Sequence, residues 1–343
     1  MAQKDTNPYR YSDSNKRYMT YDWYMRARFG GKIAKVPLDA GLTCPNKDGT
    51  CGTGGCVFCL AGSTSARGGL MSLTDQYEQG VRTASRKWVP SGFIPYLQAN
   101  TNTYGEIQEL RKIWNEAASM PGAMMLDIAT RADCLNGEVL DELAELSRKI
   151  PLTVELGLQS SSDLTAERIN RGHTFHEFVD GWAGLKRTAD AVNSGCPSNK
   201  PNGFLFRRFT ICIHIINGLP GESRETMMQT ALDVAELMPD MVKIHLLHVL
   251  KGTELEKMYI SGDYAPLTPE EYVDTTCGQL EVLPPETCIA RITGDAPDEL
   301  LVAPLWCRRK TQVTNNIDKE LFKRNTYQGR LFTLHTPLFQ KEY

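Results

Sequence analysis

The sequence lacks an uninterrupted apolar run of about 18 residues, the length that a membrane-spanning helix needs. Its first 24 residues, MAQKDTNPYRYSDSNKRYMTYDWY, also lack the apolar core of a secretory signal peptide. Positive charge is not in surplus, because 38 Lys and Arg residues stand against 41 Asp and Glu residues, a formal net charge of −3. No strong positive field therefore surrounds the whole protein. We expect a cytoplasmic protein that has no membrane partner.

Cysteine is also scarce, and most of it is scattered. Ten cysteines in 343 residues are too few and too irregular for the disulfide framework of a small secreted protein. Six occur singly, and we expect small buried residues or surface thiols and no second metal cluster: Cys134, Cys196, Cys212, Cys277, Cys288 and Cys307. The other four fall within residues 44–59, CPNKDGTCGTGGCVFC. In a reducing cytosol such a group binds metal or does chemistry more often than it forms disulfides.

The spacing of these four cysteines favours an iron–sulfur cluster and leaves zinc open. Structural zinc sites usually combine two CxxC pairs, whereas here only Cys56 and Cys59 form such a pair. Glycines at positions 49, 52, 54 and 55 would let the backbone fold around a bulky group and direct amide N–H donors at it. Thiolates that accept such donors suit an iron–sulfur cluster.

Apolar runs rich in β-branched residues alternate along the chain with stretches of helical spacing. The predicted strands are residues 32–38, 93–98, 123–130, 152–159, 209–216 and 241–249. The predicted helices between them are residues 75–88, 107–119, 138–149, 175–192 and 222–237, and 194–203 is a long loop. Six strand–helix repeats predict an α/β protein whose parallel sheet is covered by helices, either doubly wound or a barrel.

Polar residues follow several of these strands. They lie in the cysteine loop and at residues 98–102, 130–131, 159–161 and 217–222. Because ligands of parallel α/β proteins gather at the carboxyl ends of the strands, these groups should share one mouth. The sequence therefore predicts a site at this edge of the sheet.

Long stretches of the chain resemble a radical S-adenosylmethionine (SAM) protein of the YhcC-like group, related to the radical SAM domain of the Elongator catalytic subunit. The resemblance runs from about residue 17 to 330. The stretches that carry it are RFGGKIAKVPLDAGLTCPNKDGTCGTGGCVFC, YLQANTNTYG, IATRADCL, VELGLQSSSDLTAERINRGH, IHIINGLPGE, VKIHLLHVLKGT, EEYVDTTCGQLEVLPP, IARITGDAP and NTYQG. So many matches in order are far more specific than a single motif.

The resemblance implies a use for three of the four clustered cysteines. The family pattern C-x11-C-x2-C falls on Cys44, Cys56 and Cys59, which would bind three irons of a [4Fe–4S] cluster. In such enzymes the fourth iron binds SAM, and reduction of the cluster releases a 5′-deoxyadenosyl radical that abstracts hydrogen from the substrate. The pattern asks for no cysteine at Cys51, so we expect this residue to be a spectator.

The resemblance also implies a SAM pocket at the ends of the strands. Its expected members are Gln98, Asn100, Asn102, Thr130, Glu155, Gln159, Gly218 and Gly221. Strand alternation would point Glu155 and Gln159 into the mouth. Structural alternatives remain, because Glu155 would equally suit a buried pair with Arg131 or Arg171, and residues 130–133 would suit a helix cap.

Substrate contacts are less defined, and no catalytic residue beyond the cluster is assigned. Arg171, Lys243 and His245 are candidate substrate contacts. His245 and His248 should lie on opposite faces of one strand, so they should not bind one metal side by side. A buried structural histidine is the competing interpretation of each.

The substrate class is indicated by charge and by the resemblance. Residues 306–330 hold seven basic residues against two acidic ones, which suits either a phosphate-contacting patch or the exposed face of a terminal helix. Elongator relatives alter the carbon-5 side chain of the wobble uridine of tRNA, but their acetyltransferase domain has no counterpart in this sequence. We expect a tRNA-modifying enzyme of the transferase or lyase type that acts on an existing side chain.

Two alternatives stay open. One is a radical SAM enzyme for a small metabolite or a protein side chain, and the other is a zinc-stabilised RNA-binding protein without catalysis. For a radical SAM enzyme with either kind of substrate, an electron donor such as flavodoxin or ferredoxin is an expected partner.

The expected architecture is a partial, open (β/α)6 barrel of the TIM type with a C-terminal α+β extension packed on it. We place an N-terminal arm at 1–29, a radical SAM core at 30–262 and a dependent extension at 263–343. Within the extension, LTPEEYVDTTCGQLEVL is a predicted amphipathic helix and CIARITG a predicted strand.

Overall fold

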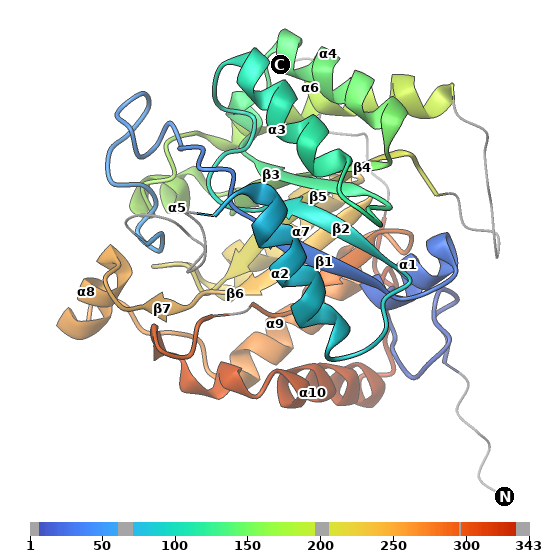
Figure 1. Ribbon diagram of the computed structural model, residues 1–343. Helices are drawn as coiled ribbons and strands as arrows, with labels where there is room; N and C mark the ends of the chain where they lie inside the picture. Colours follow the sequence, from blue (N-terminus) through green and yellow to red (C-terminus); the bar gives the residue numbers. More distant parts are fainter. Residues whose placement is uncertain (1–6, 61–70, 196–205, 295, 334–343) are drawn as a thin grey trace, which may run out of the picture. The chain divides into compact units, whose positions relative to one another are not determined.

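A computed structural model describes residues 7–60, 71–195, 206–294 and 296–333 of the chain (Figure 1). Seven strands form one sheet in the order β1-β2-β3-β4-β5-β6-β8. They are β1 (Ile33–Leu38), β2 (Gly92–Leu97), β3 (Leu126–Thr130), β4 (Leu152–Gln159), β5 (Phe209–Asn217), β6 (Met241–Leu246) and β8 (Cys288–Arg291). The pairs β1–β2, β2–β3, β3–β4 and β6–β8 are parallel.

The strand order distinguishes a barrel from a doubly wound sheet. In a doubly wound sheet the order reverses at a switch point, whereas here the first six strands are neighbours in the order of the sequence. The sheet stays open, because β1 has only β2 beside it among the described strands. This confirms the predicted α/β fold with an open (β/α)6 barrel, to which β8 adds a seventh strand.

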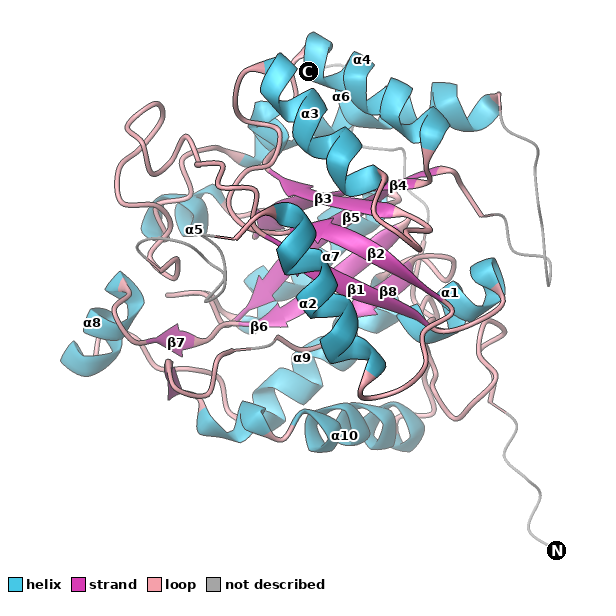
Figure 2. Cartoon of the chain, in the orientation of Figure 1, coloured by secondary structure: helices cyan, strands magenta, loops and turns pink. Residues whose placement is uncertain are grey.

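Helices precede, separate and follow the strands of the sheet (Figure 2). They are α1 (Tyr21–Phe29), α2 (Leu73–Ser85), α3 (Ile107–Ala118), α4 (Gly137–Lys149), α5 (Asp163–Arg168), α6 (Phe175–Ser194), α7 (Arg224–Leu237), α8 (Glu254–Ser261), α9 (Pro269–Val282) and α10 (Lys310–Lys323). Several begin at a side chain that accepts a backbone N–H, such as Ser72 of α2 and Asn136 of α4. No helix in the described residues combines the length and the apolar character required to cross a bilayer.

The buried strands confirm the expected covering on both faces. Every residue of β3 and the first seven residues of β4 are buried, as a sheet with helices outside and side chains inside requires. The alternation separates the two faces: Val154, Leu156 and Leu158 are apolar and fully buried, whereas Thr153 and Glu155 on the other face are polar.

The described residues divide into two compact units, one of which contains Met25–Leu158 and Ala166–Ile213. The other unit contains Met1–Tyr24, Gln159–Thr165 and His214–Tyr343. In this second unit the N-terminal segment is hydrogen-bonded to the C-terminal region. The Tyr9 hydroxyl donates to the Pro285 carbonyl at 2.6 Å, and the Met19 amide donates to Gln328 Oε1 at 2.9 Å. In this unit α9 packs against α7 and α10. The helix α9 and the strand β8 confirm the helix and the strand predicted for the extension. The domain boundaries at residues 29 and 262 stay a prediction.

One predicted strand was too long. The run 241–249 is interrupted, because β6 ends at Leu246 and the Leu247 amide then donates to the Asn217 carbonyl at 3.0 Å. The chain resumes as β7 (Val249–Leu250), which pairs antiparallel with β9 (Leu301–Ala303). His248 therefore lies outside β6, and the opposite-face argument for His245 and His248 does not hold. Most of the predicted loop 194–203, including Cys196, lies outside the described residues.

Candidate functional site: a cysteine loop held by a distant segment

The four clustered cysteines lie in the long loop between β1 and α2 (Figure 2). The loop turns first after Cys44, whose carbonyl accepts the Lys47 amide at 2.8 Å, and again at Cys56, whose carbonyl accepts the Cys59 amide at 2.8 Å. Between these turns Gly54 and Gly55 have φ values of 79° and 78°, a conformation that glycine adopts without steric cost. The backbone thus bends back on itself between the first and the last cysteine.

Cys56 is the most enclosed of these cysteines. Its thiol has a pKa lowered to about 5, because the Cys59 thiol donates a hydrogen bond to it and the Arg171 guanidinium lies beside it, against the opposing effect of burial. The same hydrogen bond, together with burial, raises the pKa of Cys59 well above its usual range. Asn46 Nδ2 and Arg171 Nη1 also point at Cys56 Sγ, at 3.7 and 3.9 Å. The first thiolate of the pair therefore forms at Cys56.

Residues 169–172, the segment after α5, hold the loop from outside. The Val57 amide donates to the Ile169 carbonyl at 3.0 Å. Asn170 Nδ2 donates to the carbonyls of Thr53 and Gly55 at 3.1 and 2.8 Å, and Asn170 itself has a φ of 53°. Left-handed backbone at a residue other than glycine is costly and occurs where the surroundings require it.

Sequence reasoning missed this contact. The turn signal was visible, because INRG joins an asparagine that tolerates left-handed φ to a glycine just after a short helix. Nothing local, however, indicates that the turn meets a loop more than 100 residues earlier.

Cys51 lies in a turn of the loop that is separate from Cys56. Its residue is exposed, its amide donates to the Pro45 carbonyl at 2.9 Å, and its sulfur lies 3.8 Å from Arg131 Nη2. Arg131 also pairs with Asp133 at 2.7 Å. The proposed capping role of residues 130–133 is wrong, because α4 is capped by Asn136 and no side chain caps the short 3-10 turn Ala132–Cys134.

The residues after β2 are largely bonded within the protein. Gln98 is exposed, but Asn100 Nδ2 donates to the Leu42 carbonyl at 2.9 Å and Asn100 Oδ1 accepts from Lys47 at 2.9 Å. Asn102 is fully buried, and its Nδ2 lies 2.9–3.1 Å from the carbonyls of Leu97, Ala99 and Ala129. The Thr130 hydroxyl bonds to that of Thr103 at 2.5 Å. Asn100, Asn102 and Thr130 therefore support the cysteine loop and the strand ends.

A buried charged group lies on the polar face of β1, β3 and β4. Lys35 Nζ is 2.5 Å from Asp127 Oδ2 and 2.8 Å from Glu155 Oε1, and both carboxylates are buried. The proposed pairing of Glu155 with Arg131 or Arg171 is therefore replaced by one with Lys35. A lysine, an aspartate and a glutamate in the middle of three apolar strands were the signal for this group, since unpaired charges are not buried.

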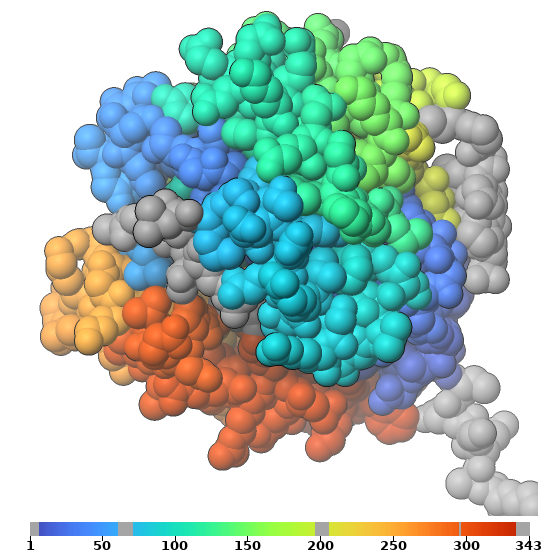
Figure 3. All heavy atoms as spheres, in the orientation of Figure 1, coloured from blue at the N-terminus to red at the C-terminus, as the bar shows by residue number. Residues whose placement is uncertain are grey.

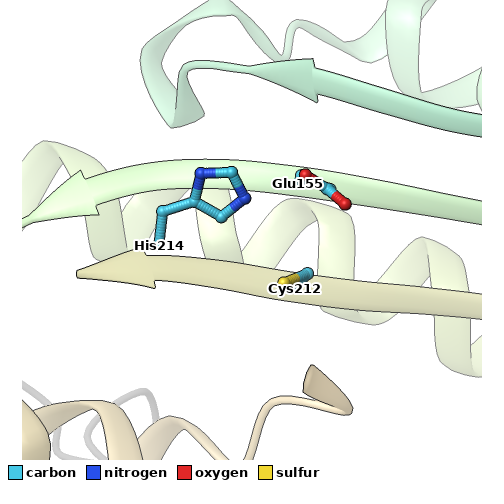
Figure 4. A group of neighbouring side chains, drawn as sticks. All are labelled: Glu155, Cys212 and His214. Atoms are coloured by element: carbon cyan, nitrogen blue, oxygen red, sulfur yellow. The ribbon is translucent and has the colours of Figure 1, made fainter. Parts of the chain in front are cut away.

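Glu155 also lies near two residues of β5. Glu155, Cys212 and His214 each offer a ligand atom, and these atoms are within 4.8 Å of one another (Figure 4). Cys212 was expected to be an isolated buried thiol, and it is buried as predicted but has ionisable neighbours. The Lys35 ammonium already holds the Glu155 carboxylate, so these three residues carry no metal assignment here.

The two glycines after β5 have a left-handed backbone conformation, which glycine adopts without steric cost. Gly218 and Gly221 have φ values of 86° and 74°, and a Cβ on Gly218 would lie 3.0 Å from Leu267 Cγ. The next residue, Glu222, accepts a hydrogen bond from the Ser160 hydroxyl at 2.5 Å, and burial raises the pKa of this carboxyl to about 7. At the end of β4, Gln159 has a φ of 75°.

The three candidate substrate contacts have different surroundings. Arg171 faces Cys56 and also donates from Nη2 to the Gly157 carbonyl. Lys243 is buried, and the His245 ring lies 5.3 Å from the His214 ring, centroid to centroid. Burial lowers the pKa of His248 to about 4, so this histidine is neutral at pH 7.

The basic residues of the C-terminal region are partly neutralised. Arg324 pairs with Asp274 at 2.6 Å and with Glu320 at 2.9 Å, and Lys323 also reaches Glu320, at 3.4 Å. Arg308 lies 3.4 Å from Asp298. The red surface in Figure 3 includes α10, whose charged residues are mostly exposed. The surplus of positive charge counted along the sequence is therefore smaller in the fold, because Asp274 of α9 and Asp298 contribute carboxylates from outside residues 306–330.

The arrangement around Cys56 fits an iron–sulfur cluster. Cys44, Cys56 and Cys59 form no disulfide, and two N–H donors point at the Cys56 sulfur. Arg171 Nε and Asn46 Oδ1 are buried without a hydrogen-bond partner among the described residues. Thiolate ligands with N–H donors directed at their sulfurs are the surroundings in which such clusters are found.

Comparison with known proteins gives the same result. Residues 49–234 match the model of the radical SAM superfamily, and residues 239–323 match that of the radical SAM C-terminal domain. The chain is 41% identical to the Bacillus subtilis protein YtqA, over 95% of this chain and 96% of that one. It is 33% identical to Escherichia coli protein YhcC, over 86% and 89%.

More distant relatives are longer than this chain. The chain is 24% identical to a tRNA uridine(34) acetyltransferase of Methanocaldococcus jannaschii over 79% of its own length but only 53% of that protein's. In a structure of Methanocaldococcus infernus Elp3, 64% of that chain matches 86% of this one with a TM-score of 0.59 and 20% identity, which shows the fold alone. The chain belongs to the radical SAM superfamily, in a YhcC-like group related to Elongator, and is an enzyme that binds a [4Fe–4S] cluster and SAM.

Proposed function

We propose that Cys44, Cys56 and Cys59 hold the cluster and that the enzyme modifies tRNA at the side chain of the wobble uridine. The likeness to tRNA uridine(34) acetyltransferase over 79% of the chain is the observation that carries the choice of substrate. When bound and reduced, the cluster supplies the electron that cleaves SAM into methionine and a 5′-deoxyadenosyl radical. Membership of the family removes the zinc alternative.

The chain's own residues fall into two groups: those that hold the cysteine loop and the edge of the sheet, and those that would contact SAM. The 169–172 segment and Asn100 fix the cysteine loop through the bonds described above. Asn102, Thr130 and Glu155 support the edge of the sheet. We propose direct SAM contacts for Gln98, Gln159, Gly218 and Gly221. Of these, Gln98 and Gly221 are exposed, whereas Gly218 is buried and packs against Leu267.

The acetyl transfer of that relative is not part of the proposal. The chain matches about half the length of the tRNA uridine(34) acetyltransferase, so we carry over the tRNA and not the acetyl group. The proposed substrate is a wobble uridine that already bears a side chain at carbon 5. A flavodoxin or ferredoxin in the cytoplasm is the proposed electron donor.

One observation favours the alternative of a small-metabolite or protein substrate. Arg308, Lys323 and Arg324 lie in ion pairs, which lowers the charge available to bind phosphates. Lys319, Arg309 and Arg330 remain as candidate phosphate contacts. Their removal should reduce the salt dependence of tRNA binding if tRNA is the substrate.

The decisive experiment measures 5′-deoxyadenosine released anaerobically by the reconstituted, reduced enzyme. Three samples are compared: no RNA, tRNA lacking wobble modifications, and tRNA whose wobble uridine carries a carbon-5 side chain. We expect the largest rise with the third sample. An equal rise with both tRNAs would move the reaction to another nucleotide. No rise with either would replace tRNA by a metabolite or protein substrate.

A matched pair of variants controls this experiment. Cys56→Ala removes a proposed ligand and should abolish release in all three samples. Lys319→Ala changes only an exposed side chain of α10, so it should keep the basal release and weaken only the stimulation by tRNA.

A further inference from the structure

Arg171 is a buried cation beside a proposed cluster ligand. Its residue is 6% exposed, as is Cys56, and its Nη1 lies 3.9 Å from Cys56 Sγ. Its other hydrogen bonds are to backbone: Nη2 donates to the Gly157 carbonyl, and the Arg171 amide donates to the Ala166 carbonyl at 2.8 Å. Among the described residues, no carboxylate forms an ion pair with it. Asp133 attracts this guanidinium coulombically but forms no ion pair with it. A buried cation without an anion in direct contact is costly, so the geometry asks for an anion at this position.

Asn46 supplies a second donor to the same sulfur. It is fully buried, and its Nδ2 lies 3.7 Å from Cys56 Sγ and 2.5 Å from the Asn170 carbonyl. Its position is tightly limited, because a Cβ on Gly52 would lie 2.1 Å, and a Cβ on Gly172 2.8 Å, from Asn46 Oδ1. The loop and the 169–172 segment therefore leave space for the asparagine only by having glycine at both positions.

The three proposed ligands are unequal in this respect. Within the described parts of the chain, Cys56 is the one of the three whose sulfur accepts side-chain N–H donors. Hydrogen bonds to the sulfurs and nearby charge are two of the factors that set the potential of an iron–sulfur cluster. Reduction takes one electron from an external donor, makes and breaks no bond, and adds one negative charge. A positive charge beside Cys56 thus stabilises the reduced cluster more than the oxidised one.

We propose that Arg171, aided by Asn46, raises the reduction potential of the cluster through Cys56. This role rests on the proposed ligand set. Arg171 then acts on the electron transfer that precedes SAM cleavage, and not as the substrate contact that its sequence position indicated. Both residues are positioning residues, since they act through a ligand.

The test is an anaerobic redox titration of the reconstituted full-length protein with dithionite, followed by the EPR signal of the reduced cluster. Arg171→Met should lower the equilibrium constant for reduction about tenfold, which corresponds to about 59 mV for a one-electron couple. Arg171→Lys should restore part of this shift. Asn46→Asp, which replaces a donor by a carboxylate of similar size, should also lower the midpoint.

The matched control is Arg208→Gln, which removes the same charge elsewhere in this unit. Arg208 precedes β5, and its guanidinium donates to the carbonyls of Ser147 and Arg148, so its loss should leave the midpoint unchanged. An unshifted midpoint in Arg171→Met at full iron content would overturn the proposal, as would an equal shift in Arg208→Gln. If Arg171→Met fails to bind iron, an unshifted midpoint in Asn46→Asp would overturn it instead.

The titration contains neither tRNA nor SAM, so it separates this proposal from the proposed function. Full iron and an unchanged EPR signal in Cys56→Ala would refute the ligand set. A missing response to tRNA would leave the measured potentials intact.

Discussion

The cysteine loop and the α9–α10 surface use charged residues in opposite ways. At the loop, Arg171 is buried, has no carboxylate partner among the described residues, and points at a thiol. At the C-terminal end of α10, the capping residue Arg324 is partly exposed and has two carboxylate partners, Asp274 and Glu320. Charges that are exposed and paired contribute little to stability and are weakened by salt. A buried charge without a direct ion-pair partner is costly, and such groups cluster at functional sites.

The largest expected effect comes from removing one cysteine from each part of the loop and comparing the two variants. Cys56→Ala should abolish both iron binding and SAM cleavage, because this thiol is buried among the donors that suit a cluster. Cys51→Ala should leave iron content and SAM cleavage near those of the wild type, because Cys51 is exposed and bonded to Arg131. Iron analysis and 5′-deoxyadenosine release measure both. Loss in both variants would show that the cluster uses Cys51.

The next largest effect should come from Asn170, which ties the loop down. Asn170→Ala removes two side-chain hydrogen bonds and places alanine at a φ of 53°, so it should cost about 3 kcal/mol of unfolding free energy and speed the loss of iron to a chelator. Asn170→Gly keeps the backbone and should recover part of the stability. Asn325→Ala, at a φ of 47° after α10, is the matched control. If iron loss were as fast in Asn325→Ala, the faster loss would reflect lower overall stability and not the missing contact between Asn170 and the cysteine loop.

A smaller, pH-dependent effect should come from Glu222. Its carboxyl has a pKa of about 7 in the folded chain against 4.5 ordinarily, because it is buried. The folded state therefore holds a proton that the unfolded state has lost, and stability falls as pH rises from about 4.5 to 7. Glu222→Gln should remove this loss, a gain of at most about 3 kcal/mol at pH 8 relative to pH 4.

Denaturant unfolding at several pH values measures the difference. Exposed Glu225 is the control, since hydrogen bonds lower the pKa of its carboxyl and its contribution has the opposite sign. A Glu222→Gln variant with the same pH dependence as the wild type would contradict the assignment.

The smallest effect belongs to the α10 surface. Lys323 is exposed and reaches Glu320 at 3.4 Å, so Lys323→Ala should change the unfolding free energy by less than about 0.5 kcal/mol. Arg324→Ala should cost about 1 kcal/mol at most, less at high salt. Larger, salt-independent losses would mean that this surface resembles the loop after all.

The strand and helix pattern could be predicted from the sequence because it depends on local periodicity. The predicted strand 152–159 has the bounds of β4, and the predicted helix 107–119 differs from α3 by one residue. The cysteine spacing likewise identifies its loop, since the three proposed ligands lie within residues 44–59. Such features depend only on the pattern of residues within a short stretch of the sequence.

The contacts of the site could not be predicted in the same way. Arg171 reaches Cys56 across 115 positions, and Lys35 reaches Glu155 across 120. The sequence shows that such charges are buried but not which partner each one finds. The arginine partner expected for Glu155 is therefore wrong, because β1 supplies a lysine.

The tie between Asn170 and the cysteine loop also bears on biosynthesis. Cys44–Cys59 leave the ribosome first, but the groups that hold Thr53 and Gly55 follow 115–117 residues later. At translation rates of about 5–20 residues per second, roughly 6–23 s pass during which the thiols are made but their loop has no support. Iron delivered in that interval would meet an unformed site, so maturation of this enzyme should begin only once the chain beyond α5 has emerged.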